Sequence, residues 1–209
     1  MFGIHNYWLF IVSGLLLNIT PGQDTLYIVG RSTSQGRRAG VLSVLGISTG
    51  CLVHTLAAAF GLSAVLVASS HAFMVVKFIG AAYLVYLGFQ MLFSRASAHN
   101  EVTSGPPVPG WVIYRQAILT NVLNPKVALF FMAFLPQFIE PGSGMKVMAF
   151  LILGLTFIFN GTIWCMLVVW FASAFSQRLR QRHSTESWLK RATGALFIGL
   201  GLKIAFEKT

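Results

Sequence analysis

The sequence predicts an all-α membrane protein, and two observations carry that prediction. Of the 209 residues, 56% are hydrophobic and only 10% are charged, whereas soluble domains carry about 25% charged residues. Apolar segments of roughly 20 residues, the length needed to cross a bilayer as a helix, also follow one another along the chain with polar connections between them. Six transmembrane helices account for the whole length and leave no room for a soluble domain.

The expected spans cover about residues 7–29, 39–68, 73–93, 111–138, 146–175 and 192–206. Tyr7 and Trp8 open the first span as interfacial aromatic residues. In the second span, the two glycines of Gly46-Ile-Ser-Thr-Gly50 fit the small-xxx-small pattern of close helix contact. Residues 94–110 are polar and rich in proline, so we expect one transporter domain over 1–209 whose halves, 1–93 and 111–209, are joined by this linker.

The distribution of Lys and Arg predicts the orientation of the chain in the membrane. The odd-numbered connections, residues 31–38, 94–115 and 176–191, hold ten of these residues, whereas the even-numbered ones hold only Lys146. Basic connections stay in the cytoplasm, so both termini are expected in the periplasm. This asymmetry also accounts for the net charge of +10, so the charge does not indicate nucleic-acid binding.

The stretch Asn18-Ile-Thr-Pro-Gly-Gln-Asp24 interrupts the first span. Pro21 removes a backbone donor and Gly22 adds flexibility, so the helix is expected to break there. Asp24 is the only aspartate of the chain, and the four glutamates fall in connections or at the tail. A carboxylate inside a membrane span costs roughly 2.5–3.5 kcal/mol on insertion scales and usually faces an interior or a water-filled path. A broken helix with such a group is how many transporters build a substrate site.

The fourth span repeats this arrangement. Asn124-Pro125 corresponds to Thr20-Pro21, and other short matches, such as Leu45-Gly-Ile-Ser48 with Leu153-Gly-Leu-Thr156, recur in the same order. Two repeats of three spans each must have opposite orientations, which predicts an inverted repeat with helices 1 and 4 both broken at proline. Lys126 follows Pro125 directly. The two breaks therefore bring one anion and one cation to the same depth, which suits a small zwitterion.

Each polar residue near the breaks has two interpretations. Asp24 either couples protons or binds a substrate ammonium group, or it is a structural partner of Lys126. Lys126 either binds a substrate carboxylate or neutralises Asp24. Four further residues either bond the substrate or satisfy backbone groups that the prolines free: Asn18, Thr20, Asn121 and Asn124. His54 and Asn160 are candidates for cavity lining, although a hydrogen-bonded core histidine and a contact between helices are the simpler roles.

Five segments carry a resemblance to a known family: Thr20-Pro-Gly-Gln-Asp24, residues 30–40, residues 80–88, Asn121-Val-Leu-Asn-Pro-Lys126 and Phe134-Leu-Pro-Gln-Phe138. Together they resemble the lysine exporter (LysE) superfamily, and within it the homoserine/threonine resistance (RhtB) branch of amino-acid exporters. Gln23 stands where the first motif more often has proline.

The resemblance implies proton-coupled export of small neutral amino acids or analogues, similar to homoserine, threonine or leucine, across the bacterial inner membrane by alternating access. The expected partners are the amino acid, protons and the lipid bilayer, without a cofactor. The small-residue faces are compatible with a homodimer but serve packing within one chain equally well.

Other classes of function fit less well. An inorganic-cation exporter of the same superfamily would need several carboxylates, His or Cys side chains that converge, but this chain has one aspartate opposed by a lysine. Cys51 and Cys165 lie inside apolar spans and are interpreted as small buried residues. An intramembrane enzyme would show a pair of catalytic groups or a metal motif, so we expect no enzyme and no metal site. A non-transporting scaffold remains an alternative, although it would not need charges at the breaks.

Overall fold

The computed structural model describes residues 2–64, 108–140 and 142–171, with isolated helical positions at 75, 78, 82, 85, 86, 89, 93, 195, 198, 199 and 202. In these residues the chain is helical, and its extended pairing is confined to a bridge between Ile4 and Ile139. The expected third and sixth spans lie outside the described residues apart from those isolated positions.

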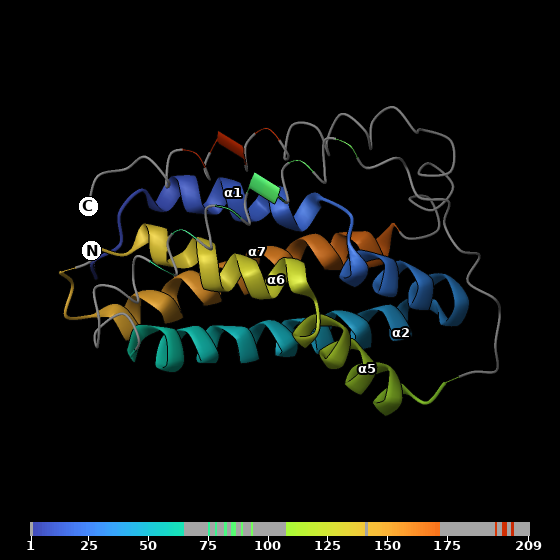
Figure 1. Cartoon of the computed structure of the whole chain (residues 1–209). Helices are drawn as coiled ribbons and strands as arrows, with labels where there is room; N and C mark the ends of the chain where they lie inside the picture. The colour runs from blue at the N-terminus through green and yellow to red at the C-terminus, as the bar shows by residue number, and fades with distance from the viewer. Residues whose placement is uncertain are drawn as a thin grey trace.

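The described helices form two runs along the chain, one before and one after residues 65–107, and the two runs pack against each other (Figure 1). The first contains α1 (Tyr7–Ile19), α2 (Gln23–Leu56) and the π-helical turn η1 (Ala57–Leu62). The second contains α5 (Gly110–Val122), α6 (Pro125–Leu129), the π-helical turn η2 (Phe130–Phe134), the 3₁₀ turn η3 (Leu135–Phe138) and α7 (Lys146–Trp170). α2 packs against α5 and α7, and α1 packs against α7.

The predicted break in the first span is confirmed. α1 ends at Ile19 and α2 begins at Gln23, with extended backbone at Thr20 (φ −66°, ψ 118°) and Gly22 (φ −151°, ψ −169°). The motif that this stretch resembles more often has proline in place of Gln23. The break forms without that proline, because Pro21 and Gly22 already interrupt the helix.

The break in the fourth span is also confirmed. α5 ends at Val122, α6 begins at Pro125, and the helices on either side are bent by 48°. Pro125 occupies the first helical position, where a missing N–H leaves no hydrogen bond unmade. The Asn124 side chain accepts a hydrogen bond of 3.0 Å from the Lys126 amide, which fixes the start of α6 as an N-cap does.

The first connection differs from the expected one over residues 31–38. Helix α2 continues through residues 31–35, and Gly36 alone has non-helical geometry within it, at φ 81° and ψ 178°. This left-handed backbone favours glycine because a Cβ atom would be strained there. Arg31 helps to extend the helix, since its guanidinium donates to the Gln35 side chain at 3.0 Å and to that of Gln116 at 2.8 Å. The first span therefore reaches Gln35, and the chain reverses at Gly36.

The start of α1 and the end of η3 lie at one end of the molecule, the start of α5 and the end of α7 lie at the other, and both helix breaks lie between (Figure 1). At one end, the amides of His5 and Glu140 donate to the carbonyls of Phe138 and Gly3, at 3.0 and 2.8 Å. At the other end, Gln35 donates to the Val108 carbonyl at 3.2 Å, and Arg37 donates to the Trp170 carbonyl at 3.5 Å. Gly36, the start of α5 and the end of α7 therefore share one end, as the grouping of basic connections requires.

The described lengths fit a membrane protein. Within the described part, residues 23–62 contain one stretch that is long and apolar enough to cross a bilayer, and helix α7 contains another. The bent pair 110–122 and 125–138, taken as one span, makes a third. The 25 residues of α7 measure about 37 Å, compared with a hydrocarbon core of about 30 Å. α1 has only 13 residues, so it completes a span only together with the part of α2 before Gly36.

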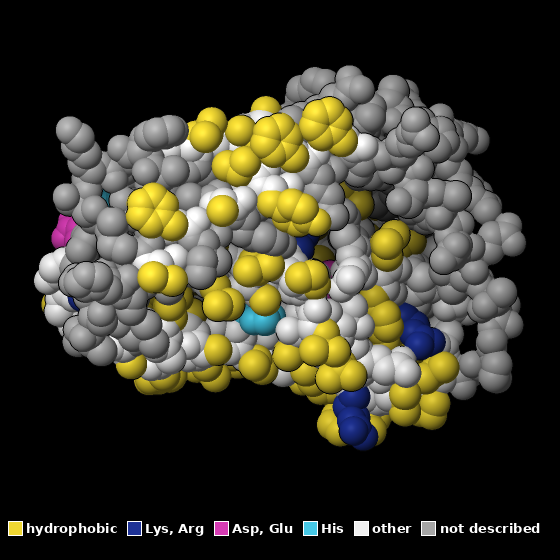
Figure 2. Space-filling view, in the orientation of Figure 1, with side chains coloured by type: hydrophobic (Ala, Val, Ile, Leu, Met, Phe, Trp, Pro, Cys, Tyr) yellow, Lys and Arg dark blue, Asp and Glu magenta, His cyan; other side chains and the backbone are white. Residues whose placement is uncertain are grey.

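The surface of the described residues is largely hydrophobic, and Lys and Arg side chains gather toward the end where α5 begins (Figure 2). Trp8 is 74% exposed at one end, whereas Trp111 and Trp170, 64% and 61% exposed, lie at the other end. Exposed tryptophans at both ends are typical of the two membrane–water interfaces.

The first and fourth spans run in opposite directions, as an inverted repeat requires. The complete repeat and the division at 94–110 stay predictions, because spans three and six lie outside the described residues.

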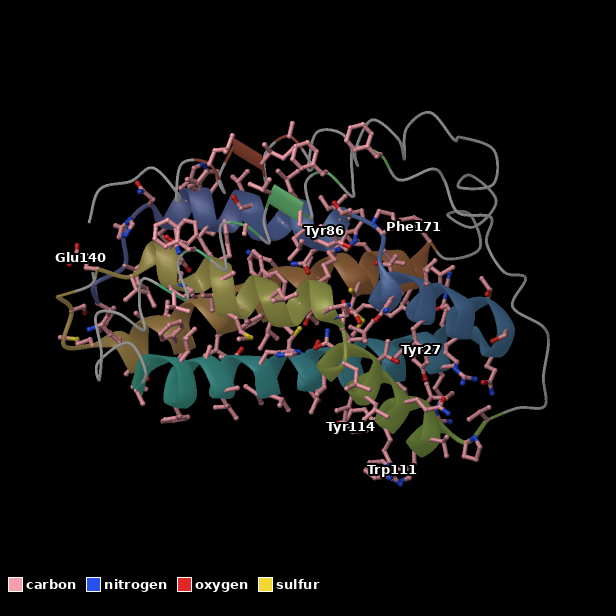
Figure 3. The ribbon with its side chains drawn as sticks, viewed as in Figure 1. Tyr27, Tyr86, Trp111, Tyr114, Glu140 and Phe171 are labelled. Atoms are coloured by element: carbon pink, nitrogen blue, oxygen red, sulfur yellow. The ribbon has the colours of Figure 1, made fainter. Side chains whose placement is uncertain are left out.

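Glycines bring α2 close to α5. A Cβ atom on Gly46 would lie 2.5 Å from both the Tyr114 carbonyl oxygen and the Ala117 Cβ, and one on Gly50 would lie 2.7 Å from the Asn121 Cβ. The predicted close contact at Gly46 and Gly50 is therefore confirmed. Tyr27 and Tyr114, labelled in Figure 3, add side-chain bonds across the same pair of helices, to the Ile113 carbonyl and to Thr49, each at 2.9 Å.

Candidate functional site

The two helix breaks contact each other directly. The side-chain amide of Asn121, at the end of α5, donates a hydrogen bond of 2.8 Å to Oδ2 of Asp24 in the first turn of α2. The ammonium group of Lys126, in α6, donates two hydrogen bonds of 2.8 Å to the carbonyl oxygens of Leu17 and Thr20 at the end of α1. Each break thus supplies a side chain to the other.

Pro21 explains why Lys126 binds these carbonyls. The Leu17 carbonyl would normally accept the amide of the residue four positions later, but that residue is Pro21, which has no N–H. The C-terminal end of α1 also carries a partial negative charge. The ammonium group supplies both the missing donor and the opposite charge. The alternative in which Lys126 pairs directly with Asp24 is not realised in this conformation, because Lys126 binds the two carbonyls and Oδ1 of Asp24 has no hydrogen-bond partner among the described residues.

The other polar residues of the breaks divide into two groups. The Thr20 hydroxyl donates to the Leu16 carbonyl at 2.7 Å, a carbonyl that also accepts the Thr20 amide at 3.0 Å. Asn124 caps α6 and so satisfies a backbone amide that the second break exposes. Asn18 behaves differently, since its buried Nδ2 has no hydrogen-bond partner in the part of the chain that the structure describes. Its side chain lies against α7, where a Cβ on Gly161 would be 3.1–3.3 Å away.

A cavity of about 40 Å³ lies beside the breaks, and Asp24, Lys126, Asn18, Gly22 and Asn124 are among its lining residues. Its wall is completed by apolar and small polar residues: Leu17, Thr25, Ile47, Ser48, Cys51, Val127, Phe157, Ile158, Gly161, Thr162 and Cys165. Pro21, Thr20, Asn121 and Pro125 shape the breaks but are not among the described lining residues.

His54 and Asn160, the two further candidates for cavity lining, are also not among the described lining residues. The His54 ring donates from Nε2 to the Asn121 carbonyl at 3.2 Å and lies 5.7 Å from the Phe131 ring, centroid to centroid. These contacts fit the simpler role of a hydrogen-bonded core histidine. Asn160 is partly buried on α7.

Several lining residues were not expected from the sequence. Ser48 and Thr162 share a hydrogen bond of 2.8 Å between α2 and α7, and the free thiols of Cys51 and Cys165 also line the cavity. Small polar residues within apolar helices have no distinctive spacing, so the sequence alone carried no signal for them. In the described residues, no group of three or more His, Cys, Asp or Glu side chains is arranged to hold a metal ion.

Comparison of the sequence with known proteins shows the family of this chain. Residues 15–208 match the family of LysE type translocators. The chain belongs to this family. Its relatives include a leucine efflux protein of Enterobacter sp. (strain 638), 26% identical over 204 residues that cover 98% of this chain and 97% of the relative. The leucine efflux protein of Salmonella typhimurium is 24% identical over 98% of this chain and 96% of its own length.

An uncharacterised membrane protein of Pseudomonas aeruginosa is 29% identical over 97% of this chain and 96% of its own length. No solved structure matches the chain significantly. This member of the LysE family is therefore a multi-pass membrane protein of a translocator family, and its relatives align with it over nearly their full length.

Proposed function

We propose that this LysE family member is a secondary exporter of neutral amino acids with aliphatic side chains, similar to leucine, across the bacterial inner membrane. In this proposal, export is coupled to protons and proceeds by alternating access, and both chain termini lie in the periplasm. The observation that carries the proposal is the set of complementary polar groups around one small cavity between the two breaks.

The polar groups match a zwitterion. The free Oδ1 of Asp24 offers an acceptor for a substrate ammonium group. The free Nδ2 of Asn18 offers a donor for a substrate carboxylate, and Lys126, whose ammonium group carries three N–H donors, uses two of them on carbonyls. A site with both an acceptor carboxylate and cationic or amide donors favours an amino acid over an inorganic cation, which would bind several anionic ligands together.

The remaining wall matches an aliphatic side chain. Leu17, Ile47, Val127, Phe157 and Ile158 give the cavity an apolar side next to its polar one. A pocket of this kind excludes a charged side chain, because burying an unpaired charge is costly. The leucine efflux proteins among the relatives support the same class of substrate.

The small volume supports alternating access. A cavity of about 40 Å³ holds on the order of three water molecules, so it is too small for leucine. Substrate entry therefore requires the two breaks to separate, and the contacts between Lys126 and α1, and between Asn121 and Asp24, are the ones that separation would change. In this proposal, the described conformation is one in which the breaks are together, and each open state has them apart.

Export from proteoliposomes tests the proposal. Purified protein is reconstituted with a panel of radiolabelled amino acids inside, and an imposed pH gradient is switched on. We expect leucine and similar aliphatic amino acids to leave faster than lysine, glutamate or a divalent cation, and faster with the gradient than without it. If the protein accelerates none of the amino acids, the proposed function is wrong. If it exports them without regard to the gradient, the proton coupling alone is wrong.

A further inference from the structure

We infer that Lys126 is a built-in cation: its ammonium group fills a carbonyl site at the broken end of α1, and removal of the lysine side chain turns that site into a binding site for a free primary alkylammonium ion. The inference concerns the same cavity as the proposed function, but its first measurement is ligand binding and does not depend on export.

Two carbonyl oxygens form the site. Those of Leu17 and Thr20 each lie 2.8 Å from the Lys126 nitrogen, which is the length expected for a charge-assisted N–H to oxygen bond. Pro21 removes the amide that would otherwise bond the Leu17 carbonyl, and Thr20 already lies outside the helix. The site therefore exists because α1 is broken, and it suits a cation that donates hydrogen bonds in two directions.

The lysine reaches this site from a separate helix. The backbone of Lys126 belongs to α6, where the Asn124 side chain holds its amide at 3.0 Å. Its ammonium group ends on α1, and a Cβ added to Gly22 would lie 3.5 Å from the lysine nitrogen. Lys126 is thus a positioning residue that joins the two breaks through one charged group.

In some transporters, backbone carbonyls at a broken helix end bind a metal ion. Unwound carbonyls and half-helix C-terminal ends coordinate sodium ions where helices are broken at the membrane midplane. Here the corresponding carbonyls are occupied by a nitrogen that belongs to the chain. The cation at this pair of carbonyls therefore stays with the protein.

The test is chemical rescue of Lys126→Ala. This variant keeps the Cβ atom and lacks the rest of the side chain, which n-propylammonium resembles in length and charge. In detergent, we expect the variant to unfold at a lower temperature than the wild type. n-Propylammonium at saturating concentration should raise that temperature by about 3–5 °C, as a ligand that binds only the folded state does. The wild type should not respond, because its site is filled.

Three controls separate site binding from general effects. Tetramethylammonium has the charge without N–H donors, and n-propanol has the chain without the charge, so neither should stabilise the variant. Lys146→Ala removes a lysine at the start of α7, away from the described lining of the cavity, and should show no response to the amine. An equal response to tetramethylammonium, or an equal response in Lys146→Ala or in the wild type, would overturn the inference.

A second variant keeps the inference testable if Lys126→Ala does not stay folded. Lys126→Met fills the space without charge, so it should be less stable than the wild type and insensitive to the amine. A Lys126→Met protein as stable as the wild type would contradict the inference. If the wild type exports no amino acid in proteoliposomes while the amine stabilises Lys126→Ala, the carbonyl site stands and the proposed function fails. If the wild type exports amino acids but the amine does not stabilise Lys126→Ala, the carbonyl site is rejected and the proposed function stands.

Discussion

Asp24 is the residue on which the proposed coupling depends. Asn121 donates to its Oδ2 at 2.8 Å, while its Oδ1 is buried beside the cavity and has no hydrogen-bond partner within residues 2–64, 108–140 and 142–171. Leaving a buried acceptor unsatisfied costs about 1–3 kcal/mol, and more for a charged group. A fold would rarely keep such a group without a use for it, so the free oxygen is the expected contact for a substrate ammonium group or a proton.

Asp24→Asn should keep the protein inserted and folded but reduce export at least about 100-fold, the low end of what a positioned proton-transfer group contributes. The side-chain amide is nearly the same size as the carboxylate but neither carries a charge nor exchanges a proton in the accessible range. Initial rates of export from proteoliposomes measure the effect.

Glu140→Gln is the matched control, because it makes the same chemical change at an exposed acid in the connection before α7. It should export at the wild-type rate. Export by Asp24→Asn at the wild-type rate would reject the coupling role of Asp24.

The residues that could be predicted from the sequence are those whose chemistry is unusual for their depth. Asp24 and Lys126 stand out in apolar spans beside prolines, so both breaks and their charges were found. Their partners were not found, since a direct ion pair is the simplest expectation for opposite charges. The carbonyl that Pro21 leaves without a donor becomes decisive only when α6 is known to lie beside the end of α1.

At the scale of helices, small residues decide how closely α2 approaches α5. Gly50 lies against Asn121, the residue that holds Asp24. The helix contact and the site are therefore linked, because widening the contact at Gly50 displaces the side chain that positions the carboxylate.

Gly50→Ala should lower the free energy of unfolding by about 1–3 kcal/mol, the usual cost of overpacking, because its Cβ would lie 2.7 Å from the Asn121 Cβ. Chemical denaturation in mixed micelles measures this change. Gly61→Ala is the control, since a Cβ there has no described atom within 4 Å. Equal stability of the two variants would show that the close approach is not needed.

The residues at which helices begin and end can be predicted from the sequence where a proline breaks the helix, and less accurately elsewhere. The polar residues 31–35 suggest a connection, but bonds from Arg31 to Gln35 and Gln116 keep them helical. The bond to Gln116 forms only because α5 lies alongside. The π-helical turns at 57–62 and 130–134 lie in uniformly apolar sequence, which carries no pattern that would distinguish them from α-helix.

Over the whole molecule, the described helix ends divide into two groups that match the distribution of basic residues. Gly36 lies at the end that carries Arg37 and Arg38, and Ser143 lies at the other end, beside Gly3. The grouping supports the proposed orientation, in which the basic end faces the cytoplasm.

Cysteine labelling tests that orientation. In a background where Cys51 and Cys165 are replaced by alanine, Ser143→Cys should react with a membrane-impermeant maleimide in intact cells. Ser34→Cys, two residues before the turn at Gly36, should react only after the membrane is permeabilised. The opposite pattern would invert the proposed topology.

The reciprocal contact between the breaks has a consequence for how this chain can change over generations. The first half supplies the carboxylate and the open carbonyls, and the second half supplies the amide and the ammonium group that bind them. Neither half contains a complete site, so a shortened chain made of one half would lose it. Whether a substitution at residues 17–24 is tolerated then depends on which residues are present at 121–126. The two stretches are therefore expected to covary among related sequences.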